Sequence, residues 1–403
     1  MRNSITLTLI MILLAMVGYT QTNIQQYPSG ELNLSDLETK FIQLCDLAVR
    51  KLSLPERQYS QDTPLRKVPY YADAYAVRAL GVAYDLTGNE KYLNTMKIWS
   101  DRMITNQQKM IPKGGYYMNY GRKPFETDGE WFVADCGEIS MGLLSTATRC
   151  RIPMERERYI NSVESFANLV LENYIDPEGG IRDGMWSKSN DSNPWIVGYA
   201  GQVFFKLFDE KEQRRYLYAG INAINWLANH NVVREIYSKD SLYLEFNPPI
   251  NNDASSGVIR AILDPYTAGV SHIFSGQFPT VKKVADEQID VIMKWFESNL
   301  LGKGESGTYE KYDVRKGKVG GKMGYLPCQI YILIQHNILP KSMMKIADKE
   351  LQRIVAEIFS YDEQLLTELT MFSMCSMAER ISPGSLYRNI DPVYQIVIKE
   401  NKN

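Results

Sequence analysis

The chain has 403 residues, of which 44% are hydrophobic and 23% are charged, and its formal net charge is -2. This is the composition of an ordinary globular protein. A chain so close to neutrality lacks the basic face that nucleic-acid-binding proteins present, so we expect no nucleic-acid partner. Tyrosine is the one abundant residue type that departs from average usage, with 26 copies.

The N-terminus has the features of an export signal. An apolar run over 5–17 follows Arg2, and this run is shorter than the roughly 20 residues that a membrane-spanning helix needs. We therefore expect residues 1–20 to be a cleaved signal peptide. Residues 21–403 are then expected to form a single secreted or periplasmic domain, with no membrane span after cleavage.

Six segments carry apolar residues on one helical face and charged residues on the other, which predicts amphipathic helices. In chain order they lie at 37–48, 92–103, 159–170, 216–226, 285–296 and 344–358. A capping box of Ser35 and Glu38 is predicted to open the first of them. Only residues 241–246 and 394–399 have the pattern of extended strands.

A second type of segment alternates with the first. These segments are rich in Ala, Gly, Ser and Met and are apolar almost all round, which is typical of buried helices. They lie at 72–86, 134–147, 197–208, 324–335 and 364–378, with a less regular member within 254–274. Six alternations of an amphipathic and a buried helix predict an all-α (α/α)6 toroid, with six outer and six inner helices.

The connections between these helices are unequal in length. Those from inner to outer helices are short, whereas those from outer to inner helices are long, at 53–69, 109–133, 175–194, 231–253 and 301–321. In a closed ring of hairpins the long loops all emerge on one face, together with the N-terminal ends of the inner helices. Loops of this length in a compact domain are usually functional.

Aromatic and polar residues are concentrated in these loops and at the helix ends beside them. Aromatic faces stack on sugar rings and planar polar groups satisfy sugar hydroxyls, so the pattern predicts an oligosaccharide or polysaccharide substrate. The alternative is that each aromatic residue only covers an end of the core. The candidate substrate-binding residues are Tyr71, Tyr117, Arg122, Trp131, Trp186, Trp195, Tyr199, Arg260 and Tyr325.

Three aspartates are candidate catalytic residues. Asp73 and Asp135 each lie near the start of a predicted inner helix, where Asp is also a good N-cap, and Asp135 with Glu138 fits a capping box. A helix N-terminus favours the charged carboxylate, so a general acid there needs burial or a second carboxylate beside it. Asp128 is the candidate for that second group, although it could instead belong to a turn.

None of the three histidines is a convincing candidate on the long-loop face. His272 and His336 are near the opposite ends of inner helices, and His230 closes an outer helix. Histidine-based chemistry and a His-ligated zinc site are therefore disfavoured, and we expect no metal and no cofactor. Carboxylate catalysis remains, with a tyrosine base as the alternative.

Two short segments and the position of Asp73 resemble parts of a known family. Residues 135–141, Asp-Cys-Gly-Glu-Ile-Ser-Met, are similar to a segment in which a catalytic Asp opens an inner helix. Residues 195–200 are similar to a Trp-x-Arg-Gly-x-x-Trp segment but lack its Arg and its second Trp. Together with the repeats, these features resemble the six-hairpin glycosidase superfamily, and within it the unsaturated glucuronyl and rhamnogalacturonyl hydrolases.

This resemblance implies that Asp135 acts as general acid and base and protonates an enol-ether double bond so that water adds. It also implies an important role for Asp73, while the missing Arg leaves recognition of a uronic acid without its usual partner. The leading hypothesis is thus a glycoside hydrolase that acts on an oligosaccharide, including one that ends in an unsaturated uronic acid. A polysaccharide lyase or uronyl epimerase with a tyrosine base, and a non-catalytic glycan-binding protein, are the alternatives.

Overall fold

The computed structural model describes residues 31–55, 69–120, 132–184, 192, 194–230, 324–335 and 340–386. Contacts divide the chain into two units, Met1–Glu31 and Leu32–Asn403, and every helix named here belongs to the second unit. The predicted signal peptide, the expected helices within 254–274 and at 285–296, and both expected strands lie outside the described residues. Those expectations stay predictions.

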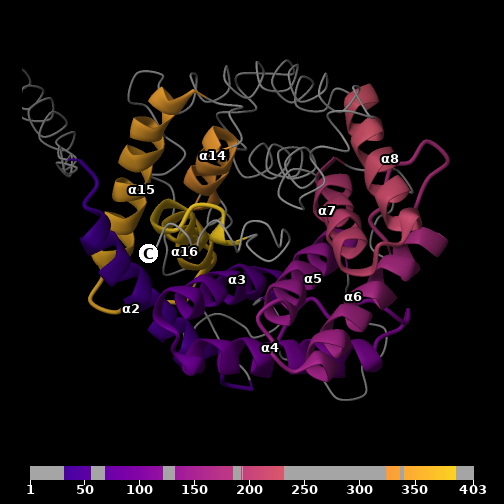
Figure 1. Ribbon diagram of the computed structural model, residues 1–403, viewed down its shortest axis with the longest axis horizontal. Helices are drawn as coiled ribbons and strands as arrows, with labels where there is room; N and C mark the ends of the chain where they lie inside the picture. The colour runs from indigo at the N-terminus through magenta and orange to yellow at the C-terminus, as the bar shows by residue number, and fades with distance from the viewer. Residues whose placement is uncertain are drawn as a thin grey trace, which may run out of the picture. The chain divides into compact units, whose positions relative to one another are not determined.

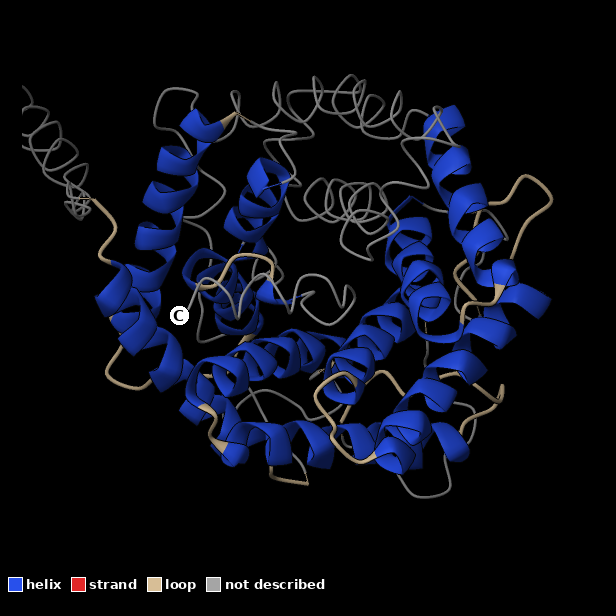
Figure 2. Ribbon diagram, viewed as in Figure 1, coloured by secondary structure: helices blue, strands red, loops and turns tan. Residues whose placement is uncertain are grey.

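Helices form the framework of the described residues, which contain isolated bridges but no strand (Figure 2). The expected all-α class is therefore confirmed for this part of the chain. The helices are α2 (Leu34–Leu52), α3 (Tyr70–Thr87), α4 (Glu90–Gln108), α5 (Val133–Ala147), α6 (Pro153–Asn173), α7 (Pro194–Lys211), α8 (Arg214–His230), α14 (Leu326–Gln335), α15 (Met344–Phe359) and α16 (Glu368–Ile381), with a short 3-10 helix, η5 (Lys341–Met343), before α15.

The two predicted types of helix are both present. In α15 only one face is buried, and it comprises Ala347, Leu351, Ile354, Val355 and Ile358. In α16, by contrast, every residue from the first to the twelfth is buried. Such a helix has no polar face to turn to solvent, so it must be surrounded by other helices.

The helices form an inner and an outer layer. Within each layer the helices follow one another along an arc in Figure 1. The inner layer has the order α14, α16, α3, α5 and α7, each packed against the next. The outer helices each cover the seam between two inner helices: α15 covers α14 and α16, α2 covers α16 and α3, α4 covers α3 and α5, and α6 covers α5 and α7, while α8 packs on α7. Closure of this arc into a toroid would involve residues 231–323, outside the described part, and stays a prediction.

The inner helices run parallel to one another. At the N-terminal ends, Tyr71 of α3 bonds to Glu368 of α16, and Glu138 in the first half of α5 bonds to Gln202 in the first half of α7. Near the opposite ends, Arg149 forms an ion pair with Asp85 of α3 at 2.7 Å. The N-terminal ends of α16, α3, α5 and α7 therefore lie at one end of the inner layer.

The described parts of two long connections lie at that end. The backbone N–H of Tyr70, which opens α3, donates to the carbonyl of Met118 in the connection after α4 at 2.7 Å. The N–H of Val133, which opens α5, donates to the carbonyl of Asp183 in the connection after α6 at 3.3 Å. The expected placement of long loops beside the inner-helix N-termini is thus confirmed for these connections.

The first outer helix begins differently from the prediction. Its N-cap is Asn33, whose side-chain oxygen accepts hydrogen bonds from the N–H groups of Ser35 at 3.0 Å and Asp36 at 3.2 Å. The predicted cap at Ser35 is therefore wrong, because Ser35 already lies inside the helix. Among the described helices, none combines the length and the apolar character needed to cross a membrane.

Candidate active site

Asp73 lies in the first turn of α3 and is fully buried, with 0% exposure. It is not the N-cap, because Pro69 occupies that position. The hydroxyl of Tyr120 donates to Asp73 Oδ2 at 2.6 Å, and Arg102 donates to the same hydroxyl at 3.2 Å. The carboxylate therefore has a defined orientation between a helix start and a long loop.

Asp135 is the third residue of α5 and is half-buried. Phe132 is the N-cap of this helix and makes no side-chain capping bond. The predicted capping box with Glu138 is wrong, since Glu138 turns into the core and accepts from Gln202 Nε2 at 2.9 Å. Asp135 is thus the least enclosed of the acids in the first turns of α3, α5 and α16, and the positive end of the helix dipole favours its charged form.

Asp183 is a second acidic residue beside the start of α5; it belongs to the long loop at 175–194, but it was not among the candidate site residues predicted from the sequence. Its backbone carbonyl accepts the hydrogen bond from Val133, and its side chain is half-buried. Burial raises the pKa of Asp183 to about 6. The sequence shows an Asp directly before a glycine, Gly184, in a long loop. In the structure the backbone of Gly184 takes a φ of 85°, which favours glycine.

The thiol of Cys136, next to Asp135 in the chain, contacts the loop that precedes α5. The N–H of Tyr116 donates to Cys136 Sγ at 3.3 Å. Burial is the main cause that raises the pKa of Cys136, and the charges of Asp135 and Asp183 both raise it further. Two carboxylates from different segments therefore both influence one buried thiol.

Glu368 is a further acid of this end of the inner layer. It opens α16, is buried with 7% exposure, and accepts a hydrogen bond from the Tyr71 hydroxyl at 2.8 Å. The prediction began this helix at residue 364, which would have placed Glu368 one turn inside it. Because α16, α3 and α5 are neighbours, their first turns present three acids: Glu368, Asp73 and Asp135.

Of the predicted sugar-contacting residues, Tyr71 is half-buried beside these acids. Tyr117, Tyr199 and Tyr325 have exposures of 6%, 8% and 2% and are packed in the core. The Tyr117 hydroxyl donates to a backbone carbonyl at 3.3 Å, and Arg78 donates to the Tyr325 hydroxyl at 3.3 Å. This burial fits the alternative in which an aromatic residue completes the core, and it does not support stacking on a sugar.

The remaining predicted site residues are not placed by the structure. Trp195 belongs to the first turn of α7, but its side chain lies outside the described part. The others lie outside the described residues altogether, so their roles stay predictions: Asp128, Arg122, Trp131, Trp186 and Arg260.

A buried polar network joins the inner helices about one turn below the acids. Arg78 of α3 and Glu138 of α5 form an ion pair at 3.7 Å, and both side chains are almost fully buried. Gln202 of α7 and the hydroxyl of Tyr325 extend the network to two further segments. A buried charge pair is stable only with added hydrogen bonds of this kind, so the network fixes how the helices that carry the acids sit against one another.

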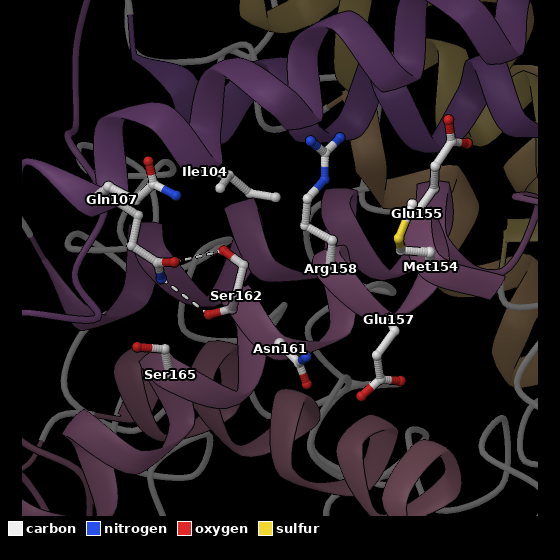
Figure 3. A pocket seen from close by; sticks show the side chains of 10 residues that line it. Ile104, Gln107, Met154, Glu155, Glu157, Arg158, Asn161, Ser162 and Ser165 are labelled. Carbon is white, nitrogen blue, oxygen red and sulfur yellow. Dashed lines mark hydrogen bonds between the residues drawn. The ribbon is translucent and has the colours of Figure 1, made fainter. Parts of the chain in front are cut away.

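A groove of about 800 Å³ lies in the outer layer, between α4 and α6 (Figure 3). Its charged residues form ion pairs with neighbouring helices: Glu155 pairs with Lys97 of α4 at 2.5 Å, and Glu157 pairs with Lys211 at the end of the inner helix α7 at 2.7 Å. In the same groove Ser162 donates to Gln107 at 2.6 Å. No predicted site residue lines this groove, so it is separate from the acids of the inner layer.

Among the described residues, no group of three or more His, Cys, Asp or Glu side chains is arranged to hold a metal ion. The five cysteines, Cys45, Cys136, Cys150, Cys328 and Cys375, are all buried. Buried cysteines behave as small hydrophobic residues.

No protein-family model matches this sequence, and a comparison with curated proteins also finds no match. Among solved structures, the fold is similar to that of the apo form of a β-1,3-1,4-glucanase from Paenibacillus sp. X4. The similarity covers 87% of this chain and 96% of that chain, with a TM-score of 0.51 and 12% sequence identity. The chain therefore has a helical fold that is also found in a glycoside hydrolase.

Proposed function

We propose that this protein is a glycoside hydrolase that acts on an oligosaccharide by carboxylate acid–base catalysis, with Asp135 as a catalytic residue. The observation that carries the proposal is the meeting of acids from separate segments at one end of the inner layer, beside the described long loops. Asp135 is the least enclosed of the three first-turn acids, and Asp183 lies against the start of the same helix. The similarity to a glucanase fold supports the same class of reaction.

Hydrolysis of a glycosidic bond needs one carboxyl group to protonate the departing oxygen and one carboxylate to activate water or attack the sugar. Acids with different surroundings can hold different protonation states at one pH, and this division of roles is what such a reaction requires. Asp73 is fully buried and hydrogen-bonded to Tyr120, which suits a role in holding the site together.

Two substrate classes follow from different observations. The resemblance of residues 135–141 to the unsaturated uronyl hydrolases favours an oligosaccharide that ends in an unsaturated uronic acid. The similarity to a β-1,3-1,4-glucanase fold favours a neutral glucan. We further propose that the protein is exported by its N-terminal segment and meets this substrate in the periplasm or outside the cell.

The test is a panel of oligosaccharides of both classes, with products followed by mass and by ultraviolet absorbance. We expect the wild type to cleave at least one substrate and Asp135→Asn to lose at least 100-fold in kcat, because general acid–base groups contribute about 10² to 10⁴-fold. Circular dichroism should show an unchanged helical spectrum. Asp36→Asn, on the exposed face of α2, is the control and should retain full activity.

Other outcomes would contradict the proposal in distinct ways. Full turnover by Asp135→Asn would remove Asp135 from the reaction. A rise in absorbance with a saturated polysaccharide would indicate a lyase, because elimination creates a conjugated double bond. Saturable binding without any product would indicate a glycan-binding protein that has the fold without the chemistry.

A further inference from the structure

The segment that carries Asp183 is built as an anchored hairpin. Ile175 and Ile181 form an antiparallel bridge, and the side chain of Asp176 accepts from the N–H groups of Glu178 at 2.9 Å and Gly180 at 2.8 Å. These contacts close the turn and leave little freedom to the residues that follow it.

Two further contacts fix the chain immediately before Asp183. The N–H of Arg182 donates to the carbonyl of Tyr174 at 2.8 Å, and its guanidinium donates to the carbonyl of Asn173 at 2.6 Å. Both acceptors lie at the C-terminal end of α6. The Arg182 guanidinium is therefore bound at the C-terminal end of α6.

Asp183 is thus held between two helices. The preceding residue, Arg182, is bound to the end of α6, and the carbonyl of Asp183 accepts from Val133 at the start of α5. Asp135 follows Val133 by two residues, which is a rise of about 3 Å along a helix. The backbones of the two aspartates are therefore tied together through one hydrogen bond and less than one helical turn.

We propose that Asp183 is the proton donor of the hydrolysis and that Asp135 is the base that activates water. This inference rests on the proposed function and assigns the two roles within that same site. It makes Asp183 a catalytic residue, although Asp183 was not among the candidates predicted from the sequence.

The surroundings of the two acids favour Asp183 as the proton donor and Asp135 as the base. Asp135 lies in the first turn of α5, where the helix dipole stabilises a negative charge. Asp183 lies outside the helix, and burial raises its pKa to about 6, so it keeps a proton in mildly acidic solution. Burial is the cause of this shift, and the nearby Cys136 thiol stays neutral because burial also raises its pKa.

In the reaction, the bond between the anomeric carbon and the glycosidic oxygen breaks, and its electron pair stays on the oxygen. The proton of Asp183 bonds to that oxygen, which leaves as a hydroxyl group. Asp135 takes one proton from a water molecule, whose oxygen bonds to the anomeric carbon. The products are two sugars with free hydroxyls, while Asp183 becomes charged and Asp135 neutral until solvent exchanges the proton.

The experiment compares two substrates that differ in how much they need a proton donor. An oligosaccharide that the wild type cleaves has a poor leaving group, whereas the dinitrophenyl glycoside of the same terminal sugar has a good one. We expect Asp183→Asn to lose about 10² to 10⁴-fold in kcat/KM on the oligosaccharide. On the dinitrophenyl glycoside the loss should be at most about tenfold.

The pH profile gives a second measurement. A proton donor must be protonated in the free enzyme, so wild-type kcat/KM should fall as the pH rises above about 6. This decline should be absent in Asp183→Asn. Asp183→Glu keeps the acid and should retain part of the activity and the decline, which a merely structural role would not require. Glu178→Gln, on the exposed turn of the same hairpin, is the control and should match the wild type.

Equal losses on both substrates, or an unchanged pH profile in Asp183→Asn, would overturn the assignment while the hydrolase function stands. If Asp183→Asn does not fold, Asp183→Glu decides the question by the same two measurements. A wild type that cleaves no substrate of either class would overturn the proposed function and this inference together.

Discussion

The hydroxyl of Tyr120 donates a hydrogen bond of 2.6 Å to Oδ2 of Asp73. Tyr120 belongs to the long connection after α4, and Asp73 to the first turn of α3. The bond therefore joins a loop to the end of an inner helix at the place where the acids gather. The Tyr120 ring also lies 4.2 Å from that of Tyr70, so the contact is both polar and aromatic.

Tyr120→Phe should lower the free energy of unfolding. The variant keeps the ring but removes one donor to a fully buried carboxylate, and loss of such a bond to a charged group costs about 1.5–3 kcal/mol. Urea unfolding followed by circular dichroism measures the change. Tyr117→Phe is the matched control, because its hydroxyl donates to a neutral backbone carbonyl at 3.3 Å, and it should cost less. Equal costs in both variants would contradict a special role for the Asp73 bond.

Asp183→Asn should change how stability depends on pH. The pKa of Asp183 is about 6 in the folded protein and about 3.8 without burial. The unfolded chain therefore releases this proton at lower pH, and Asp183 destabilises the folded state progressively as the pH rises from about 4 to about 6.

Replacement by Asn removes that loss. Relative to the wild type, Asp183→Asn should gain on the order of 1–2 kcal/mol between pH 4 and pH 7. This is less than full conversion at 1.36 kcal/mol per pKa unit, because the side chain is partly exposed to solvent. Urea unfolding at the two pH values measures the gain. A difference between variant and wild type that is the same at both pH values would disprove it.

Gly137→Ala should destabilise the contact between α5 and α7. A Cβ atom at Gly137 would lie 2.5 Å from the carbonyl oxygen of Tyr199, and this oxygen belongs to a helix backbone that cannot rotate away. Overpacking of this kind costs about 1–3 kcal/mol.

The matched control is Gly201→Ala in α7, where the nearest atom would be the Ala223 Cβ at 3.3 Å. We expect this variant to unfold at nearly the wild-type temperature, and Gly137→Ala to unfold several degrees lower. Because Gly137 lies two residues from Asp135, catalysis should fall as well. A melting temperature of Gly137→Ala that equals the wild type would show that the two helices can separate without cost.

Tyr159→Phe should weaken the outer layer. The Tyr159 hydroxyl of α6 donates to Asp101 of α4 at 2.9 Å. The same contact recurs between the neighbouring pairs of outer helices, with Tyr92 to Asp46 at 2.9 Å and Tyr216 to Glu164 at 2.8 Å.

Each tyrosine is preceded by a basic residue that lies over its ring, so the contact is a repeated structural element of the hairpins. Loss of one such bond should cost about 0.5–1.5 kcal/mol in urea unfolding. Tyr218→Phe, at a tyrosine that is 54% exposed, should cost almost nothing. A larger effect at Tyr218 than at Tyr159 would refute the interpretation.

Helix types and loop lengths could be predicted from the sequence because both depend on neighbouring residues. The spacing of apolar residues predicted the amphipathic helices, and the small apolar residues between them predicted the buried ones. The bounds agree within a few residues, as for α5, expected at 134–147 and observed as Val133–Ala147. Asp73 and Asp135 were found because their position in a first turn is also a local property.

The sequence by itself therefore determined the all-helical class, the alternation of outer and inner helices in the described part, and the side on which the long loops begin. Only the tertiary structure decided which acids come together, since Tyr71 and Glu368 are 297 residues apart along the chain and still form a hydrogen bond. The same is true of Asp183, whose backbone carbonyl accepts from another helix and whose burial raises its pKa. Hydrogen bonding and burial depend on distances in space, and a linear pattern contains those distances only within one helix or turn.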